Sequence, residues 1–219
     1  MTLIAEDLLL LLLDDQSGKP NTSHLDLALG GAVLVDLALQ GMVEVATPGS
    51  SWRSAKLRPV PGARSEDRVL AGALGAVVEN QAAQKLVAKV GKGLIEPLAD
   101  RQRQRGVLDR REEKVLGLVT RTRWPSRDPS RKESIRRGLV VILVQRGHAD
   151  ARNAALIGLL LAVHRLHRTI THPDASARAL KQRAREVAQE SWAAPMVKDA
   201  VAVATAATAA AHATAVNGE

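Results

Sequence analysis

The segment from His24 to Gly41, HLDLALGGAVLVDLALQG, is apolar on nearly all sides when it is drawn as a helix. Leu25, Leu29, Val33 and Leu37 recur at the spacing that lines one helix face. Most of the remaining positions are apolar as well, which is typical of a helix inside a bundle or a membrane. The environment of this helix therefore constrains the whole fold.

The polar residues and the length of the segment favour the bundle. It holds Asp26, Asp36 and Gln40 within about 18 residues, whereas a membrane span needs roughly 20 mostly apolar residues. Gly30 and Gly31 would each cost about 1 kcal/mol relative to Ala in an exposed helix. Their presence predicts the close approach of a neighbouring element.

The amino-acid composition agrees with a helical core. Aromatic residues make up 1% of the 219 residues, and Phe, Tyr and Cys do not occur. Leu, Ala and Val must fill the core, with Arg and Glu in abundance, which suits helices better than strands. The absence of Cys excludes disulfides, thiolate metal sites and thiol catalysis. We predict a mainly α fold, a single-domain helical bundle over residues 1–219 with one or two short β-hairpins.

The remaining chain is divided by turn residues and by changes in periodicity. We expect helices over residues 2–14, 65–80, 81–90, 94–105, 130–146, 150–172, 176–192 and 195–216, and hairpins over residues 42–60, with Trp52 at the tip, and 107–125. The apolar run at residues 8–13 follows two acids rather than a basic segment, so no signal peptide is indicated and a cytoplasmic location is expected.

The positive charge is concentrated in one stretch. Residues 101–137 contain thirteen Lys and Arg against five Asp and Glu, a local net charge of +8 that equals the net charge of the whole chain. Such a concentration indicates an anionic partner, either acidic lipid or nucleic acid.

The hairpin expected in this stretch has apolar residues in its middle and basic residues on both flanks. On a membrane, each basic residue near the surface contributes about 1 kcal/mol, so five or six would bind reversibly. We expect Val115, Leu116, Leu118 and Val119 to enter the interface, Trp124 to lie at head-group depth, and Arg110, Arg111, Lys114, Arg121 and Arg123 to face lipid phosphates.

Three other interpretations of the basic stretch stay open. The hairpin can pack on the bundle with a solvated Arg-rich rim. It can bind nucleic acid as the wing of a winged helix does, although residues 94–105 carry their bases mainly at one end and no aromatic platform for single strands occurs. The protein can also be a scaffold for other proteins without an anionic ligand.

Motifs for catalysis are not found. The sequence has no Gly-rich phosphate loop ending in Lys-Ser/Thr and no nucleophile elbow. His164 and His167 lie three apart on an expected helix, which is more typical of a polar helix edge than of a metal site. Asp36 is interpreted as a buried carboxylate tied to an Arg or to a helix cap. We therefore expect no enzyme activity, no catalytic residues, no cofactor and no metal.

Several segments together resemble the Golgi phosphoprotein 3 family, in the order that the family has them, so the resemblance covers nearly the whole chain. They are LIAEDLLLLLLDDQSGK at residues 3–19, LDLALGGAVLVDLALQG at 25–41, RGVLDRREEKVLGL at 105–118, TRWPSRD at 122–128 and ARNAALIGLLLAVHRL at 151–166. The chain is similar to a bacterial-type member with a shortened N-terminus.

The resemblance implies a mostly helical fold with short β-ribbons, no catalytic activity, and a peripheral membrane protein. Eukaryotic members bind phosphatidylinositol 4-phosphate, insert a hydrophobic hairpin and act as adaptors that retain glycosyltransferases. The expected partners are thus an anionic membrane lipid, a client protein and a second copy of the chain. The expected location is cytoplasmic, peripheral on the inner face of the membrane.

The family's lipid pocket carries over only in part. Asn21 aligns with the family's Trp before the central helix, Gly30 with an Arg inside that helix, and Lys92 and Ile95 with two further Arg. Lys92 alone keeps the charge, and it is added to the expected head-group residues. The family's four apolar tip residues align with Val115, Leu116, Gly117 and Leu118, which supports insertion of the hairpin.

Overall fold

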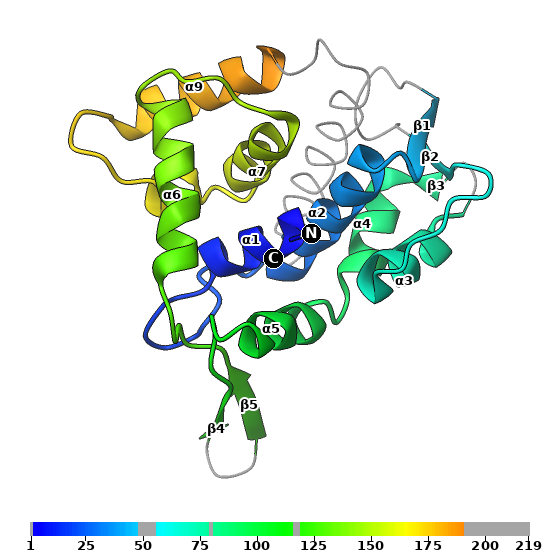
Figure 1. Cartoon of the computed structure of the whole chain (residues 1–219), viewed down its shortest axis with the longest axis horizontal. Coiled ribbons are helices and arrows are strands. Elements are labelled where there is room, and N and C mark those ends of the chain that lie inside the picture. The colour runs from blue at the N-terminus through cyan, green and yellow to red at the C-terminus, as the bar shows by residue number, and fades with distance from the viewer. Residues whose placement is uncertain (1, 48–55, 79–80, 116–118, 191–219) are drawn as a thin grey trace, which may run out of the picture.

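The computed structural model is mainly α, as predicted, with small β-sheets at two edges (Figure 1). It describes residues 2–47, 56–78, 81–115 and 119–190. The expected helix over residues 195–216 and Trp52 lie outside the described residues. Within the described part, no helix is long and apolar enough to cross a bilayer.

The predicted central helix is α2 (Leu25–Leu39), and it lies at the centre of the core (Figure 1). Residues 28–38 are buried without interruption, because neighbours cover every side of the helix. Helix α1 (Ile4–Leu12) packs beside α2 and is itself buried along its whole length. The apolar side chains of these two helices account for much of the core.

A close crossing joins α2 to α4 (Ala83–Gly91), and two glycines make it possible. A Cβ atom on Gly30 would lie 2.2 Å from the carbonyl oxygen of Val87, and one on Gly91 would lie 2.1 Å from the carbonyl oxygen of Asp26. The prediction that a neighbouring element approaches Gly30 is confirmed. Any side chain at either glycine would push the two helices apart.

The other helices surround this centre. Helices α3 (Arg68–Ala76) and α5 (Ile95–Gln104) lie on one side, and α6 (Ser130–Leu143), α7 (Ala151–Ala162) and α9 (Ala177–Glu190) lie on the other (Figure 1). The single helix expected over residues 150–172 is wrong. His164 adopts a left-handed backbone (φ 54°) that ends α7, and a short helix α8 (Leu166–Thr169) follows.

Both expected hairpins are present. Strands β1 (Val43–Thr47) and β2 (Lys56–Pro59) pair antiparallel, and β2 also pairs with β3 (Gln81–Ala82), where a helix was expected to begin. Strands β4 (Arg111–Val115) and β5 (Val119–Arg123) form the second hairpin, which projects from the helical body beyond α5 (Figure 1).

Candidate anion-binding hairpin and adjoining pocket

The register of the projecting hairpin places its three Arg on one face, whereas Glu112 and Lys114 lie on the other face. Arg111 lies opposite Arg123, and Glu113 lies opposite Arg121. Residues opposite each other on antiparallel strands share a face, and alternate residues along a strand share it too. That face therefore carries three Arg and one Glu. Arg123 Nε donates to Glu113 Oε2 at 2.8 Å, and this hydrogen bond holds the pKa of Glu113 below its usual value.

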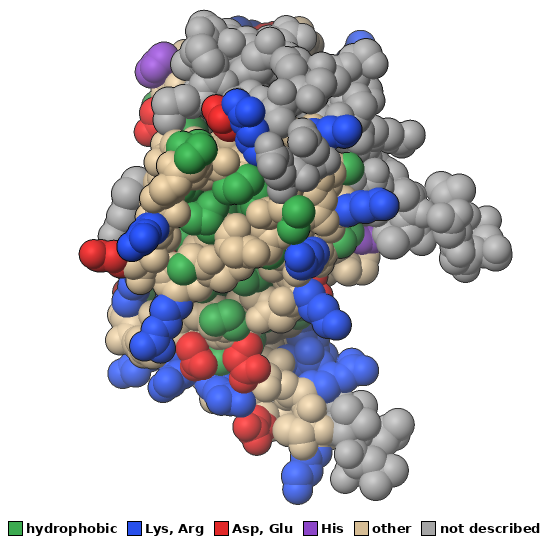
Figure 2. Space-filling model, turned by 90° about the vertical axis from the view of Figure 1, so that its right-hand side faces the viewer, with side chains coloured by type: hydrophobic (Ala, Val, Ile, Leu, Met, Phe, Trp, Pro, Cys, Tyr) green, Lys and Arg blue, Asp and Glu red, His purple; other side chains and the backbone are tan. Residues whose placement is uncertain are grey.

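The predicted head-group cations differ in their partners. Arg110 Nη2 lies 3.3 Å from Glu96 Oε1 and 3.6 Å from Glu112 Oε1, and Arg123 pairs with Glu113. The others are exposed, and within the described part of the chain the structure records no ion pair for them: Lys92, Arg111, Lys114 and Arg121. Figure 2 shows Lys and Arg gathered toward the end of the molecule that carries the hairpin, with Asp and Glu among them.

Much of the positive charge of residues 101–137 neutralises acids of the protein itself. Arg101 donates to both carboxylate oxygens of Asp67 at 2.7 Å each. Other long-range pairs are Arg105 Nη1–Glu6 Oε1 at 3.0 Å, Arg131 Nη2–Asp7 Oδ1 at 2.8 Å and Lys132 Nζ–Asp15 Oδ1 at 2.7 Å. The interpretation that assigned the whole excess to an external partner is therefore too broad. Among the exposed cations of this stretch without a recorded ion pair in the described chain, Arg111, Lys114 and Arg121 lie on the hairpin, and Arg127 and Arg137 lie outside it.

Trp124 lies in the core rather than at the hairpin tip. Trp124 is only 3% exposed, and its backbone N–H donates a hydrogen bond to the carbonyl oxygen of Gly18 at 3.2 Å. A Cβ on Gly18 would lie 2.3 Å from the backbone nitrogen of Trp124, and the Arg110 guanidinium lies 5.8 Å from the ring centroid. The protein itself thus encloses the ring, and the expected place of Trp124 at head-group depth is corrected. Trp124 fixes the hairpin base to the turn before α2.

Two of the predicted membrane-inserting residues lie at the far end of the described hairpin. Val115, the last residue of β4, pairs with Val119, the first residue of β5. Leu116 and Leu118, with Gly117 between them, lie outside the described residues. Insertion of these apolar residues stays a prediction.

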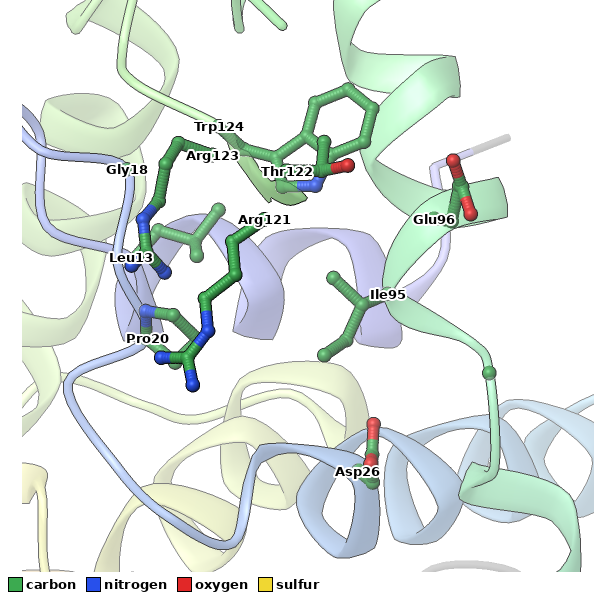
Figure 3. Close-up of a pocket in the computed structure, with 11 residues that line it drawn as sticks. Leu13, Gly18, Pro20, Asp26, Ile95, Glu96, Arg121, Thr122, Arg123 and Trp124 are labelled. Carbon is green, nitrogen blue, oxygen red and sulfur yellow. The ribbon is translucent and has the colours of Figure 1, made fainter. Parts of the chain in front are cut away.

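A pocket of about 430 Å³ adjoins the hairpin base (Figure 3). Its walls come from β5, from the turn after α1, from the first turn of α2 and from the start of α5. They comprise Leu13, Gly18, Pro20, Asp26, Gly93, Ile95, Glu96, Arg121, Thr122, Arg123 and Trp124. This volume lies within the range of about 300–1,000 Å³ that is usual for small-molecule sites.

The pocket holds charges of both signs. Glu96 and Arg123 are paired with Arg110 and Glu113, as described above. Arg121 reaches into the space from β5, and Asp26 lies across it on α2 (Figure 3). Burial raises the pKa of Asp26 above its usual value. Sequence reasoning singled out Arg121 but missed Asp26 and Glu96 as pocket residues, because only folding brings them beside the hairpin.

The positions aligned with the family's lipid pocket are only partly at this site. Ile95 lines the pocket with an apolar side chain, and Lys92 is adjacent in sequence to Gly93 on its wall. Gly30 lies against α4, where a Cβ would meet the carbonyl oxygen of Val87. An Arg at position 30 would require a different spacing of α2 and α4.

Asp36 has a structural role at the start of α1. Its carboxylate accepts hydrogen bonds from the backbone N–H groups of Ile4 at 3.0 Å and Ala5 at 3.3 Å, at the start of α1. Burial raises its pKa from 3.8 to about 6, and these hydrogen bonds oppose the rise. The interpretation of Asp36 as a carboxylate tied to a helix cap is confirmed. Among the described residues, no group of three or more His, Cys, Asp or Glu is arranged to hold a metal ion.

The comparison with protein-family models agrees with the resemblance. Residues 4–204 match the family model described as Golgi phosphoprotein 3 (GPP34). A comparison with curated proteins found no match.

Proposed function

Because the chain belongs to the Golgi phosphoprotein 3 family, we propose that it is a non-catalytic peripheral membrane protein that binds anionic lipid head groups through the β4–β5 hairpin. The family is not known as an enzyme family. The observation that carries the proposal is the projecting hairpin itself, whose Arg111, Lys114 and Arg121 are exposed and have no recorded ion pair within the described chain.

The charge on the hairpin suits reversible binding. Three cations near an anionic surface contribute about 3 kcal/mol in all, which is less than stable anchoring requires. Insertion of the apolar tip, including Leu116 and Leu118, supplies the second contribution in this proposal. By likeness to the family we place the protein at the cytoplasmic face of the membrane, with a client protein as a second partner.

Charge reversal on the hairpin tests the proposal. The double variant Arg111→Glu, Lys114→Glu replaces attraction by repulsion, so we expect binding to vesicles that contain phosphatidylglycerol to fall at least about tenfold. Co-sedimentation measures this. The matched control is Arg178→Glu, Arg185→Glu in α9, which reverses two exposed cations at the other end of the molecule (Figure 1). Equal losses in the two double variants would refute a specific role for the hairpin.

A second variant separates the membrane from nucleic acid as the partner. Leu116→Asp removes an apolar side chain from the proposed tip, so vesicle binding should weaken while binding to DNA stays unchanged. A gel-shift series with increasing salt supplies the comparison, because binding to nucleic acid falls steeply with salt in proportion to the phosphates contacted. Tight, salt-sensitive DNA binding without vesicle binding would favour the nucleic-acid alternative.

A further inference from the structure

The pocket beside the hairpin has a specific charge pattern. Its walls carry two cations, Arg121 and Arg123, and two anions, Asp26 and Glu96. Arg123 is engaged by Glu113 at 2.8 Å and Glu96 by Arg110 at 3.3 Å. Within the described residues no hydrogen bond or ion pair is recorded for the side chains of Arg121 and Asp26. Arg121 lies opposite Glu113 on the hairpin, and its charge contributes to the lowered pKa of that carboxyl. Arg121 and Asp26 face the same space from different elements.

The two side chains belong to opposite walls. Asp26 stands in the first turn of α2, and Arg121 extends from β5 (Figure 3). The apolar side chains of Leu13 and Ile95 line the same pocket. A ligand that satisfies both charges needs an anion and a cation on a short connector, and an apolar portion beside them.

We propose that this pocket binds the head group of an aminophospholipid of the phosphoethanolamine type, with Arg121 facing the phosphate and Asp26 facing the primary ammonium. The inference rests on the proposed function and names the lipid class that the membrane-bound protein recognises. Leu13 and Ile95 then lie beside the glycerol portion of the lipid.

The charge of the pocket disfavours a head group that is only negative. A phosphorylated inositol has no cation to meet Asp26, and like charges a few ångströms apart repel at a protein surface. Ile95 provides no cation on its wall of the pocket, and this also disfavours a head group that is only negative. Burial already raises the pKa of Asp26, and an ammonium group beside the carboxylate would favour its charged form.

A primary ammonium fits better than a methylated one. Charge-assisted N–H···O hydrogen bonds are about twice as strong as neutral ones, and a trimethylammonium group has no N–H to donate. The pocket should therefore distinguish phosphatidylethanolamine from phosphatidylcholine, although both head groups have zero net charge.

The test compares two kinds of vesicle with the full-length chain. Both contain the same fraction of phosphatidylglycerol, and the rest is either phosphatidylethanolamine or phosphatidylcholine. We expect the wild-type protein to bind the phosphatidylethanolamine vesicles about tenfold more tightly, as one charge-assisted hydrogen bond allows. Asp26→Asn should bind both kinds equally, at the level of wild type on phosphatidylcholine vesicles. Glu66→Gln, an exposed carboxylate outside the pocket, should keep the preference.

The outcomes separate the inference from the proposed function. If wild type binds both vesicles equally, the pocket assignment is wrong and the hairpin proposal stands. If Asp26→Asn keeps the preference, another site causes it and the assignment is also wrong. Circular dichroism of Asp26→Asn checks that the variant is folded.

Soluble head groups complete the test by calorimetry. Glycerophosphoethanolamine should bind wild type more tightly than glycerophosphocholine does, and Asp26→Asn should abolish the difference. If this holds while vesicles fail to bind, the ligand is a free aminophosphate, and the membrane proposal fails on its own. If neither soluble compound nor vesicle shows a preference for the primary ammonium, the inference is overturned.

Discussion

At the scale of single residues, Asp36 shows what can and what cannot be predicted from the sequence. A carboxylate within an apolar helix has to be satisfied by hydrogen bonds or by a counter-charge, so a structural role could be predicted from the sequence. Its partners, the backbone N–H groups of Ile4 and Ala5, are more than thirty residues away in the chain. Only the packing of α1 against α2 identifies them.

The raised pKa of Asp36 makes stability depend on pH. The carboxyl keeps its proton in the folded protein up to about pH 6, whereas the unfolded chain releases it near pH 3.8. The free energy of unfolding should therefore decrease by about 3 kcal/mol as the pH rises from about 4 to about 6. Asp36→Asn should lack this decrease. Urea denaturation across the range measures both proteins, and parallel curves for the two would contradict the prediction.

At the scale of elements, periodicity predicted most helices and the two hairpins, while their exact ends depended on tertiary contacts. The break between α7 and α8 occurs at His164 without a Gly or Pro to signal it. Strand β3 is only two residues long and exists because β2 offers it a free edge. Gly30 carried a usable signal, since two adjacent glycines in a buried helix have few uses other than close packing.

The α2–α4 crossing gives a prediction at this scale. Gly30→Ala places a methyl group against the carbonyl of Val87, so we expect the free energy of unfolding to fall by about 1–3 kcal/mol. Gly72→Ala in α3 is the matched control, because Gly72 is exposed and has open space around its Cα. That substitution should stabilise the protein by up to about 1 kcal/mol. Thermal denaturation measures both, and stabilisation by Gly30→Ala would show that the helices have room to separate.

At the scale of the whole molecule, the cations of residues 101–137 serve the interior as well as the surface. Asp7 on α1 is 3% exposed and accepts hydrogen bonds from Arg131 on α6 and from Arg152 on α7. One carboxylate thus joins three helices. The local charge could be counted from the sequence, but its division between buried acids and solvent could not, because these pairs span more than a hundred residues.

Removal of the Asp7 charge tests this connection. Asp7→Asn leaves Arg131 and Arg152 without their counter-charge, and we expect the free energy of unfolding to fall by about 2 kcal/mol, since both guanidinium groups keep partial access to solvent. Glu44→Gln removes the exposed pair with Arg58 and should cost at most about 1 kcal/mol. Denaturant unfolding compares the two variants, and a cost for Asp7→Asn no larger than the control would contradict the connection.

The buried Trp124 and the β-bridge between Leu108 and Ser126 attach the base of the hairpin to the helical body at one position. The chain leaves and re-enters the core at this position, so the β4–β5 hairpin beyond it forms a separate structural unit. For the same reason, a spectroscopic label or an affinity tag placed between Val115 and Val119 should be tolerated at little cost to folding.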